Sequence, residues 1–293
     1  MKTITRNIHV DLAVLLTAVC FCLNASTLMA QEFVAYSATG IDAAGIQGVV
    51  DAFRTAVGSP NNGNVPGPLA GGRREINWDG GGAAANATVF PIPMTNFNTP
   101  PVSRGAVFTT PGTGFEISGL PTPEFGDLNP SYPLSFITFS SPRLFTPLGS
   151  NITDVLFFRP GTDIPATTNG FGAVFTDVDL PATTSIEYFN SEDESLGKVF
   201  VPSADNGLSF VGLVFSGERV ARVRITTGNT APGPTETPGV VDVVVMDDFI
   251  YGEPLVGPPT DAEECKKGGW SEFEFPREFK NQGDCIKFVN TGK

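Results

Sequence analysis

The stretch GFGAVFTDVDLPATTSIEYFNSEDESLGKVFVPSADNGLSFVGLVFSGERVARVRIT, residues 170–226, decides the fold class of this protein. It contains short runs rich in Val, Ile, Phe and Thr, separated by clusters of Gly, Pro, Asn and Asp. In the final run, RVARVRIT, Val223 and Ile225 alternate with arginines, which places the two kinds of side chain on opposite faces of a strand. The stretch therefore predicts several short strands in succession.

Runs of the same kind occur on both sides of this stretch. They are GAVFTT (105–110), LSFITFS (134–140), ITDVLFF (152–158) and VVDVVVMDDFIYG (240–252). Closely spaced strands with Gly and Pro turns are typical of a sandwich or jelly roll, and strands do not alternate with helices as a parallel α/β fold requires. We therefore predict a mainly β fold, an antiparallel β-sandwich or jelly roll, with its body over residues 73–252.

Residues 31–72 are predicted to be a lead-in that contains one amphipathic helix and a loop. Apolar residues recur there at helical spacing: Ile46, Val49, Val50, Phe53 and Val57. Asp42 is suited to cap the start of this helix and Gly58 to end it. SPNNGNVPGPLAGG (59–72) has the composition of a loop. We expect the helix to pack on the sheet.

The first thirty residues have the layout of a secretory signal peptide. Lys2 and Arg6 precede the apolar run LAVLLTAVCFCLNA (12–25), and a small residue, Ala30, precedes Gln31. Cleavage is expected after Ala30, with Ala25 as the alternative. The run is shorter than the ~20 residues of a membrane span, and no later run is longer. We predict a secreted or cell-surface protein whose mature chain has no membrane span.

Composition excludes several classes of function. The net charge of −13 disfavours contact with phosphate backbones, so no nucleic-acid partner is expected. The only histidine, His9, lies in the signal peptide, which excludes Ser-His-Asp and Cys-His catalysis and histidine-ligated zinc in the mature chain. Cys265 and Cys285 are the only cysteines left after cleavage, and an exported chain meets oxidising conditions. They are predicted to form one disulfide.

The end of the chain is predicted to be a separate module. EPLVGPPTDAEE (253–264) has the composition of a linker, and residues 265–293 contain five lysines, whereas residues 31–260 contain only Lys198. Phe273 and Phe275 alternate with glutamates, as on a strand with one covered face. A pairing strand is expected from Ile286, Phe288 and Val289.

Two groups of residues are candidates for ligand binding. Trp78 and Asp79 end GGRREINWD, and an exposed Trp beside a carboxylate is suited to a sugar, because the ring stacks on C–H faces while the acid accepts hydroxyls. The alternative is a buried Trp that anchors the first strand. Asp177, Asp179, Asp247 and Asp248 are candidate ligands for a structural Ca²⁺, a cation that prefers six to eight oxygens. Their alternatives are solvated acids and a glycosidase pair.

Two parts of the chain show a family resemblance. The motifs of residues 71–252 are GRREINWDG, RGAVFTTPGTGFEIS, FGDLNPSYP, GFGAVFTDVDL and VDVVVMDDFIYGEP. Through them this part resembles a group of functionally uncharacterised exported bacterial β-sandwich proteins. CKKGGWSEFEFPREFKNQGDCIKFVNTGK (265–293) is similar to a two-cysteine tail of other exported bacterial proteins. The resemblance implies export, a β-sandwich body and a detachable tail, and it implies no substrate. The likeness to jelly-roll carbohydrate-binding modules with a structural Ca²⁺ is at the level of the fold.

Three functions are compatible with these observations. The first is a non-catalytic secreted binding or adhesion protein for an extracellular glycan or another cell-surface ligand. The second is a structural surface or matrix protein without a small ligand, which a surface without a pocket would favour. The third is a carboxylate-based secreted glycoside hydrolase, which requires two acids facing each other across a cleft.

Overall fold

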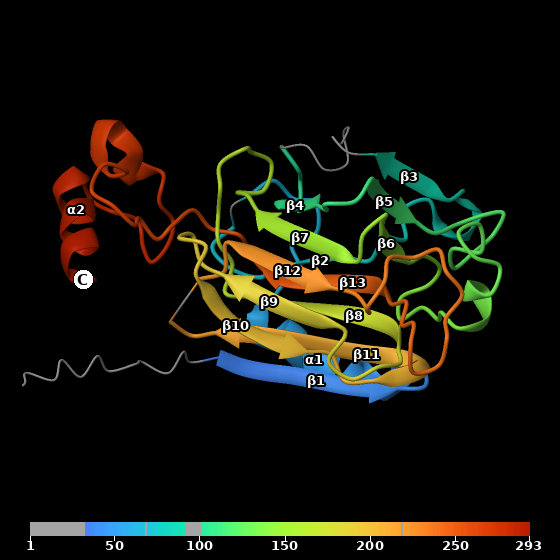
Figure 1. The fold of residues 1–293 in the computed structure, drawn as a ribbon. Coiled ribbons are helices and arrows are strands. Elements are labelled where there is room, and N and C mark those ends of the chain that lie inside the picture. The colour runs from blue at the N-terminus through green and yellow to red at the C-terminus, as the bar shows by residue number, and fades with distance from the viewer. Residues whose placement is uncertain (1–32, 68, 92–100, 218) are drawn as a thin grey trace, which may run out of the picture. The chain divides into compact units, whose positions relative to one another are not determined.

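The computed structural model describes residues 33–67, 69–91, 101–217 and 219–293. The predicted signal peptide, residues 1–30, lies outside them. The described chain is mainly β, with two antiparallel sheets that bury a common core (Figure 1). The structure therefore confirms the predicted antiparallel β-sandwich.

The larger sheet has eight strands, and β13 lies at its centre. Seven strands follow the order β1 (Phe33–Gly40), β11 (Ala204–Phe215), β8 (Gly170–Val178), β13 (Val245–Gly252), β6 (Phe145–Leu148), β5 (Gly114–Ile117) and β3 (Thr88–Pro91). β2 (Arg73–Ile76) pairs with the second half of β13, whereas β6 pairs with its start. β1 was not predicted, because its residues fall in the segment expected to be a lead-in.

The smaller sheet has five strands. Their order is β10 (Ser195–Phe200), β9 (Ser185–Phe189), β12 (Arg222–Thr226), β7 (Ile152–Phe157) and β4 (Ala106–Thr109). On β12, Val223 and Ile225 are fully buried between the sheets while Arg224 is exposed, as the alternation predicts. Aromatic rings fill much of the core, and Phe108, Phe145 and Phe249 contact one another there.

The predicted amphipathic helix is α1 (Ala43–Val57). The Asp42 side chain caps its start by accepting a hydrogen bond from Gly45 N at 3.0 Å, and Gly58, with φ of 137°, ends it. Its buried residues pack on the outer face of the larger sheet; they are Ile46, Val50, Phe53 and Val57. A helix of 15 residues is marginal in water by itself, so the packing of this apolar face supplies most of the stability of α1.

LSFITFS (134–140) is not a strand, contrary to the prediction. It follows a 3₁₀ turn, η2 (Tyr132–Leu134), and another short turn, η1 (Gly82–Ala84), precedes β3. In the second half of this segment backbone N–H groups donate to side chains: Ile137 N to Thr176 Oγ1 at 3.0 Å and Phe139 N to an Asp247 carboxylate oxygen at 2.6 Å. Side-chain acceptors thus replace the ladder of a neighbouring strand.

The C-terminal module contains η3 (Lys266–Ser271), α2 (Gln282–Thr291) and the predicted Cys265–Cys285 disulfide, whose Cα atoms lie 5.7 Å apart. The prediction of a strand over residues 286–289 is wrong, because these residues belong to α2. Asn281 accepts a hydrogen bond from Asp284 N at 3.0 Å and so caps this helix, and Gly292, with φ of 68°, ends it. Local capping decides helix over strand here.

The segment predicted as a linker, residues 253–264, begins with contacts to the sandwich. Leu255 N donates to Thr167 O at 2.9 Å, and Val256 O accepts from Glu274 N at 2.9 Å and from Phe275 N at 3.1 Å. These bonds connect the sandwich to the first residues of the linker and to the C-terminal module. Residues 31–293 form one compact unit.

Candidate functional site

Trp78 lies in the core and not on the surface. Its side chain is only 4% exposed, its ring stacks on Phe145 at 3.8 Å between centroids, and Nε1 donates to Asp247 O at 2.8 Å. Asp79 accepts hydrogen bonds from Arg143 N at 3.1 Å and from Asn77 Nδ2 at 2.7 Å. The predicted sugar-binding role of Trp78 and Asp79 is therefore replaced by the structural alternative, because a buried ring cannot stack on a sugar.

Asp247 and Asp248 lie where the pairing of β13 with β8 shifts register, between Met246 and Phe249. Their carboxylates bind protein groups: Ser140 N donates to Asp247 at 3.2 Å, Ser140 Oγ to Asp248 at 2.6 Å and Arg54 to Asp248 at 3.2 Å. Burial raises the pKa of Asp247 and raises that of Asp248 to about 6. This pair holds α1 and the segment before β6 against the sheet.

Asp177 and Asp179 belong to a different group of carboxylates. Among the described residues, oxygens of Asp177, Asp179 and Asp205 lie within 4.8 Å of one another, and so do oxygens of Asp179, Glu236 and Asp242. We call these five residues the acidic cluster. It does not include Asp247 or Asp248, so the structure divides the predicted four-carboxylate set into two places.

Three separate segments build the acidic cluster. Asp177 and Asp179 lie at the end of β8, Asp205 lies in an irregular part of β11, and the other two lie between β12 and β13. Asn206 N donates to Asp177 Oδ1 at 2.7 Å, and Asp179 N donates to Asp242 Oδ1 at 3.2 Å. Asp205 and Glu236 were not predicted, because they come from segments that only the tertiary fold brings to the end of β8.

The acidic cluster concentrates negative charge that no described basic side chain neutralises. The ion pairs of the described residues involve none of its five carboxylates. Burial, followed by repulsion from Asp177, raises the pKa of Asp179 to about 6 and that of Glu236 to about 8. The arrangement is therefore suited to bind either protons or a cation.

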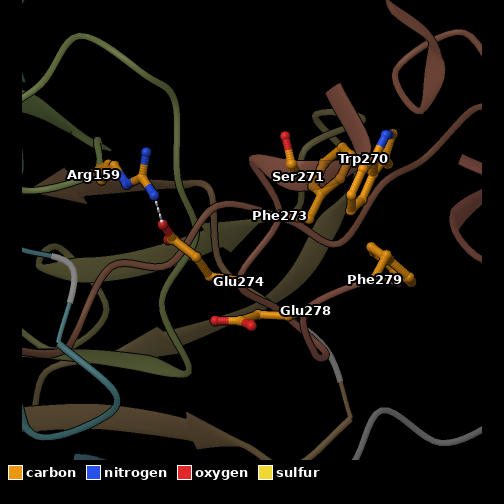
Figure 2. Close-up of a pocket in the computed structure, with 7 residues that line it drawn as sticks. All are labelled: Arg159, Trp270, Ser271, Phe273, Glu274, Glu278 and Phe279. Atoms are coloured by element: carbon orange, nitrogen blue, oxygen red, sulfur yellow. Dashed lines mark ion pairs between the residues drawn. The ribbon is translucent and has the colours of Figure 1, made fainter. Parts of the chain in front are cut away.

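A second candidate site lies on the C-terminal module (Figure 2). We call it the Trp270 pocket, a cavity of about 300 Å³ whose lining residues are Arg159, Trp270, Ser271, Phe273, Glu274, Glu278 and Phe279. Figure 2 shows the aromatic rings gathered on one side and the charged side chains on the other. Trp270 is partly exposed, unlike Trp78, and these are the chain's only two tryptophans.

The charged side of the Trp270 pocket is anchored to the sandwich. Arg159, which follows β7, forms an ion pair with Glu274, and the second oxygen of Glu274 accepts from Val256 N at 2.9 Å. Arg159 Nε is buried and has no acceptor among the described residues. Glu278 is exposed, and none of the described residues forms a hydrogen bond or ion pair with its carboxylate. The Glu278 carboxylate is therefore free to bind a polar ligand.

These observations define the class of the protein: an antiparallel β-sandwich with a disulfide-bonded C-terminal module that carries an aromatic and acidic pocket. Neither a protein-family model nor a curated protein sequence matches the chain. Among the helices of the described residues, none combines the length and the apolar character needed to span a membrane.

Proposed function

We propose that this chain is an exported, non-catalytic binding or adhesion protein that binds a glycan through the Trp270 pocket. The observation that carries the proposal is the partly exposed Trp270 ring beside the carboxylates of Glu274 and Glu278. The ligand class is the one expected from the sequence. The side chains that would bind it are those of the C-terminal module instead of Trp78 and Asp79.

The chemistry of the lining residues matches a sugar. An indole ring offers a flat apolar face to the C–H groups of a pyranose, and carboxylate oxygens accept its hydroxyl protons. The guanidinium of Arg159, which lines the pocket, supplies donors for the hydroxyl oxygens. A cavity of about 300 Å³ is at the small end of the range for ligand sites, which favours one or two sugar rings over a long chain.

Export and a non-catalytic role rest on separate support. The Cys265–Cys285 disulfide is compatible with an oxidising compartment, and the first thirty residues have the signal-peptide pattern. The only histidine of the chain is His9, which removes the commonest general base from the mature protein. Glu274 is held by Arg159 and by Val256 N, which suits a positioned binding group.

A glycan array on the purified protein tests the proposal, with Trp270→Ala and Glu278→Gln as variants. Phe200→Ala is the matched control, because Phe200 is 50% exposed on β10 and does not line the Trp270 pocket. We expect the wild type and Phe200→Ala to bind the same glycans. Trp270→Ala should lose about tenfold in affinity, since an aromatic ring contact contributes roughly 0.5–1.5 kcal/mol beyond the apolar area that it buries.

Three results would contradict the proposal in different ways. If no glycan binds, the ligand class is wrong. If Trp270→Ala binds as tightly as the wild type, the pocket is wrong. If the bound glycan is cleaved and Glu278→Gln abolishes the cleavage, the protein is a hydrolase instead.

A further inference from the structure

The acidic cluster contains carboxylate oxygens that no described hydrogen-bond donor satisfies. Asp177 is 1% exposed, and its Oδ2 is buried without a partner, as is Oδ1 of Asp179. A buried carboxylate oxygen without a donor costs free energy, and the large majority of buried side-chain polar atoms in native proteins have a partner. Two such oxygens in one cluster require either a proton shared between carboxyl groups or a bound cation.

Charge and geometry identify the kind of group. A cation satisfies several carboxylate oxygens at once, whereas a water molecule can donate only two hydrogen bonds. Oxygens on opposite sides of a Ca²⁺ ion are about 5 Å apart, given Ca–O distances of about 2.3–2.6 Å. The oxygens of each carboxylate group in the acidic cluster lie within 4.8 Å of one another, which fits that spacing.

We propose that the acidic cluster is a Ca²⁺ site in which Asp177 and Asp179 bind the ion together with Asp205, Glu236 and Asp242. All five ligands supply oxygen, and no histidine or thiolate is present to favour zinc or copper. Asp179 belongs to both carboxylate groups and is therefore the central ligand.

The ion would connect three segments that are far apart in the sequence. Asp177 lies near the end of β8 and Asp179 directly follows that strand, Asp205 belongs to β11, and the remaining ligands belong to the connection between β12 and β13. The bound ion would therefore join β8 and β11 of the larger sheet to the connection that leads from β12 in the smaller sheet to β13 in the larger one.

Thermal unfolding and calorimetric titration of the purified protein test the site. With Ca²⁺ at 100 times its dissociation constant, we expect Tm to rise by about 5–10 °C over the value in EDTA. Titration with CaCl₂ should give saturable binding, and MgCl₂ should bind at least tenfold more weakly because Mg²⁺ demands a smaller octahedral site. An unchanged Tm and no binding heat would overturn the proposal, and equal binding of Mg²⁺ would overturn the assignment to calcium.

Asp177→Asn and Asp179→Asn are the decisive variants. Asn tolerates the φ of 64° at position 177 and keeps the oxygen that accepts from Asn206 N. Each change removes repulsion, so the variants should melt at or above the wild-type temperature in EDTA and lose the increase with Ca²⁺.

Asp163→Asn, which removes one exposed charge outside the cluster, is the control and should respond to Ca²⁺ as the wild type does. Either cluster variant retaining the full response would overturn the ligand set. The test uses no glycan, so its outcome is independent of the Trp270 pocket.

Discussion

Arg74 and Glu253 form a two-pronged ion pair in the interior of the protein: Nε and Nη2 of the arginine each lie 2.7 Å from a different carboxylate oxygen. Both side chains are at most 1% exposed. The pair joins β2 to the first residue of the segment predicted as a linker. Arg74 also donates to the carbonyl oxygens of Gly63, Val65 and Ser103, so it organises the loops around it.

We predict that Arg74→Met or Glu253→Gln lowers the free energy of unfolding by roughly 3–5 kcal/mol, because each leaves a buried charge without its partner. Arg73→Met is the matched control. Its partly exposed ion pair with Glu75 should contribute only about 0–1 kcal/mol. Urea unfolding measures all three. If Arg73→Met and Arg74→Met lower the free energy of unfolding equally, burial does not strengthen the Arg74–Glu253 pair, and the prediction is wrong.

The space for the Phe53 ring depends on two glycines that face each other on β8 and β11, Gly172 and Gly212. A Cβ at Gly212 would lie 2.6 Å from Phe53 Cε2. We predict that Gly212→Ala costs about 1–3 kcal/mol through overpacking, and that the cost falls when Phe53 is shortened to Leu.

Gly48→Ala is the control for this prediction, because its Cβ would meet nothing within 4 Å on the exposed side of α1. It should stabilise the protein by about 0.5–1 kcal/mol. Chemical denaturation of the single and double variants measures the coupling between Gly212 and Phe53. Strict additivity of the two substitutions would contradict the role assigned to the ring.

Glu116 on β5 should make stability depend on pH. Burial, followed by the nearby Asp127, raises the pKa of this carboxyl to about 8. In the unfolded chain the pKa of a glutamate is about 4.3, so the folded state binds this proton more tightly than the unfolded state does. The contribution of the proton to the free energy of unfolding therefore decreases as pH rises from about 5 to above 8.

Glu116→Gln removes this dependence. Relative to the wild type, the Tm of the variant should therefore be higher at pH 8.5 than at pH 5. The exposed Glu192→Gln controls for the loss of one charge. If the difference in Tm between Glu116→Gln and the wild type is the same at pH 5 and pH 8.5, the prediction is refuted.

The disulfide should stabilise the C-terminal module locally. The module has only a small apolar cluster around Cys265, Phe279 and Cys285, and closing a loop of about 20 residues contributes ~3 kcal/mol. In Cys265→Ala/Cys285→Ala, we expect faster hydrogen exchange in residues 265–293 and little change in the strands of the sandwich. Unchanged protection of α2 would mean that contacts with the sandwich suffice to hold the module.

Local patterns in the sequence determined the sandwich, α1 and the disulfide. The alternation on β12, the cap at Asp42 and the presence of only two cysteines after residue 30 each act through neighbouring residues, so they can be read without coordinates. Two predicted strands, over residues 286–289 and 134–140, are not formed, and in each case a competing hydrogen bond explains why. Asn281 caps α2, so residues 286–289 form a helix and not a strand. The Asp247 carboxylate accepts the hydrogen bond of Phe139 N, which is then not available to a neighbouring strand.

Only the tertiary structure decided which side chains meet at the candidate sites. Both tryptophans lie near acids in the sequence, yet packing against Phe145 buries Trp78 while Trp270 stays partly exposed. Asp177 meets Asp205 because β8 and β11 pair, and it meets Glu236 because the connection between β12 and β13 folds back to the end of β8; no spacing along the chain encodes either meeting. A site assembled from distant segments depends on long-range pairing, whereas strands and caps depend on residues a few positions apart.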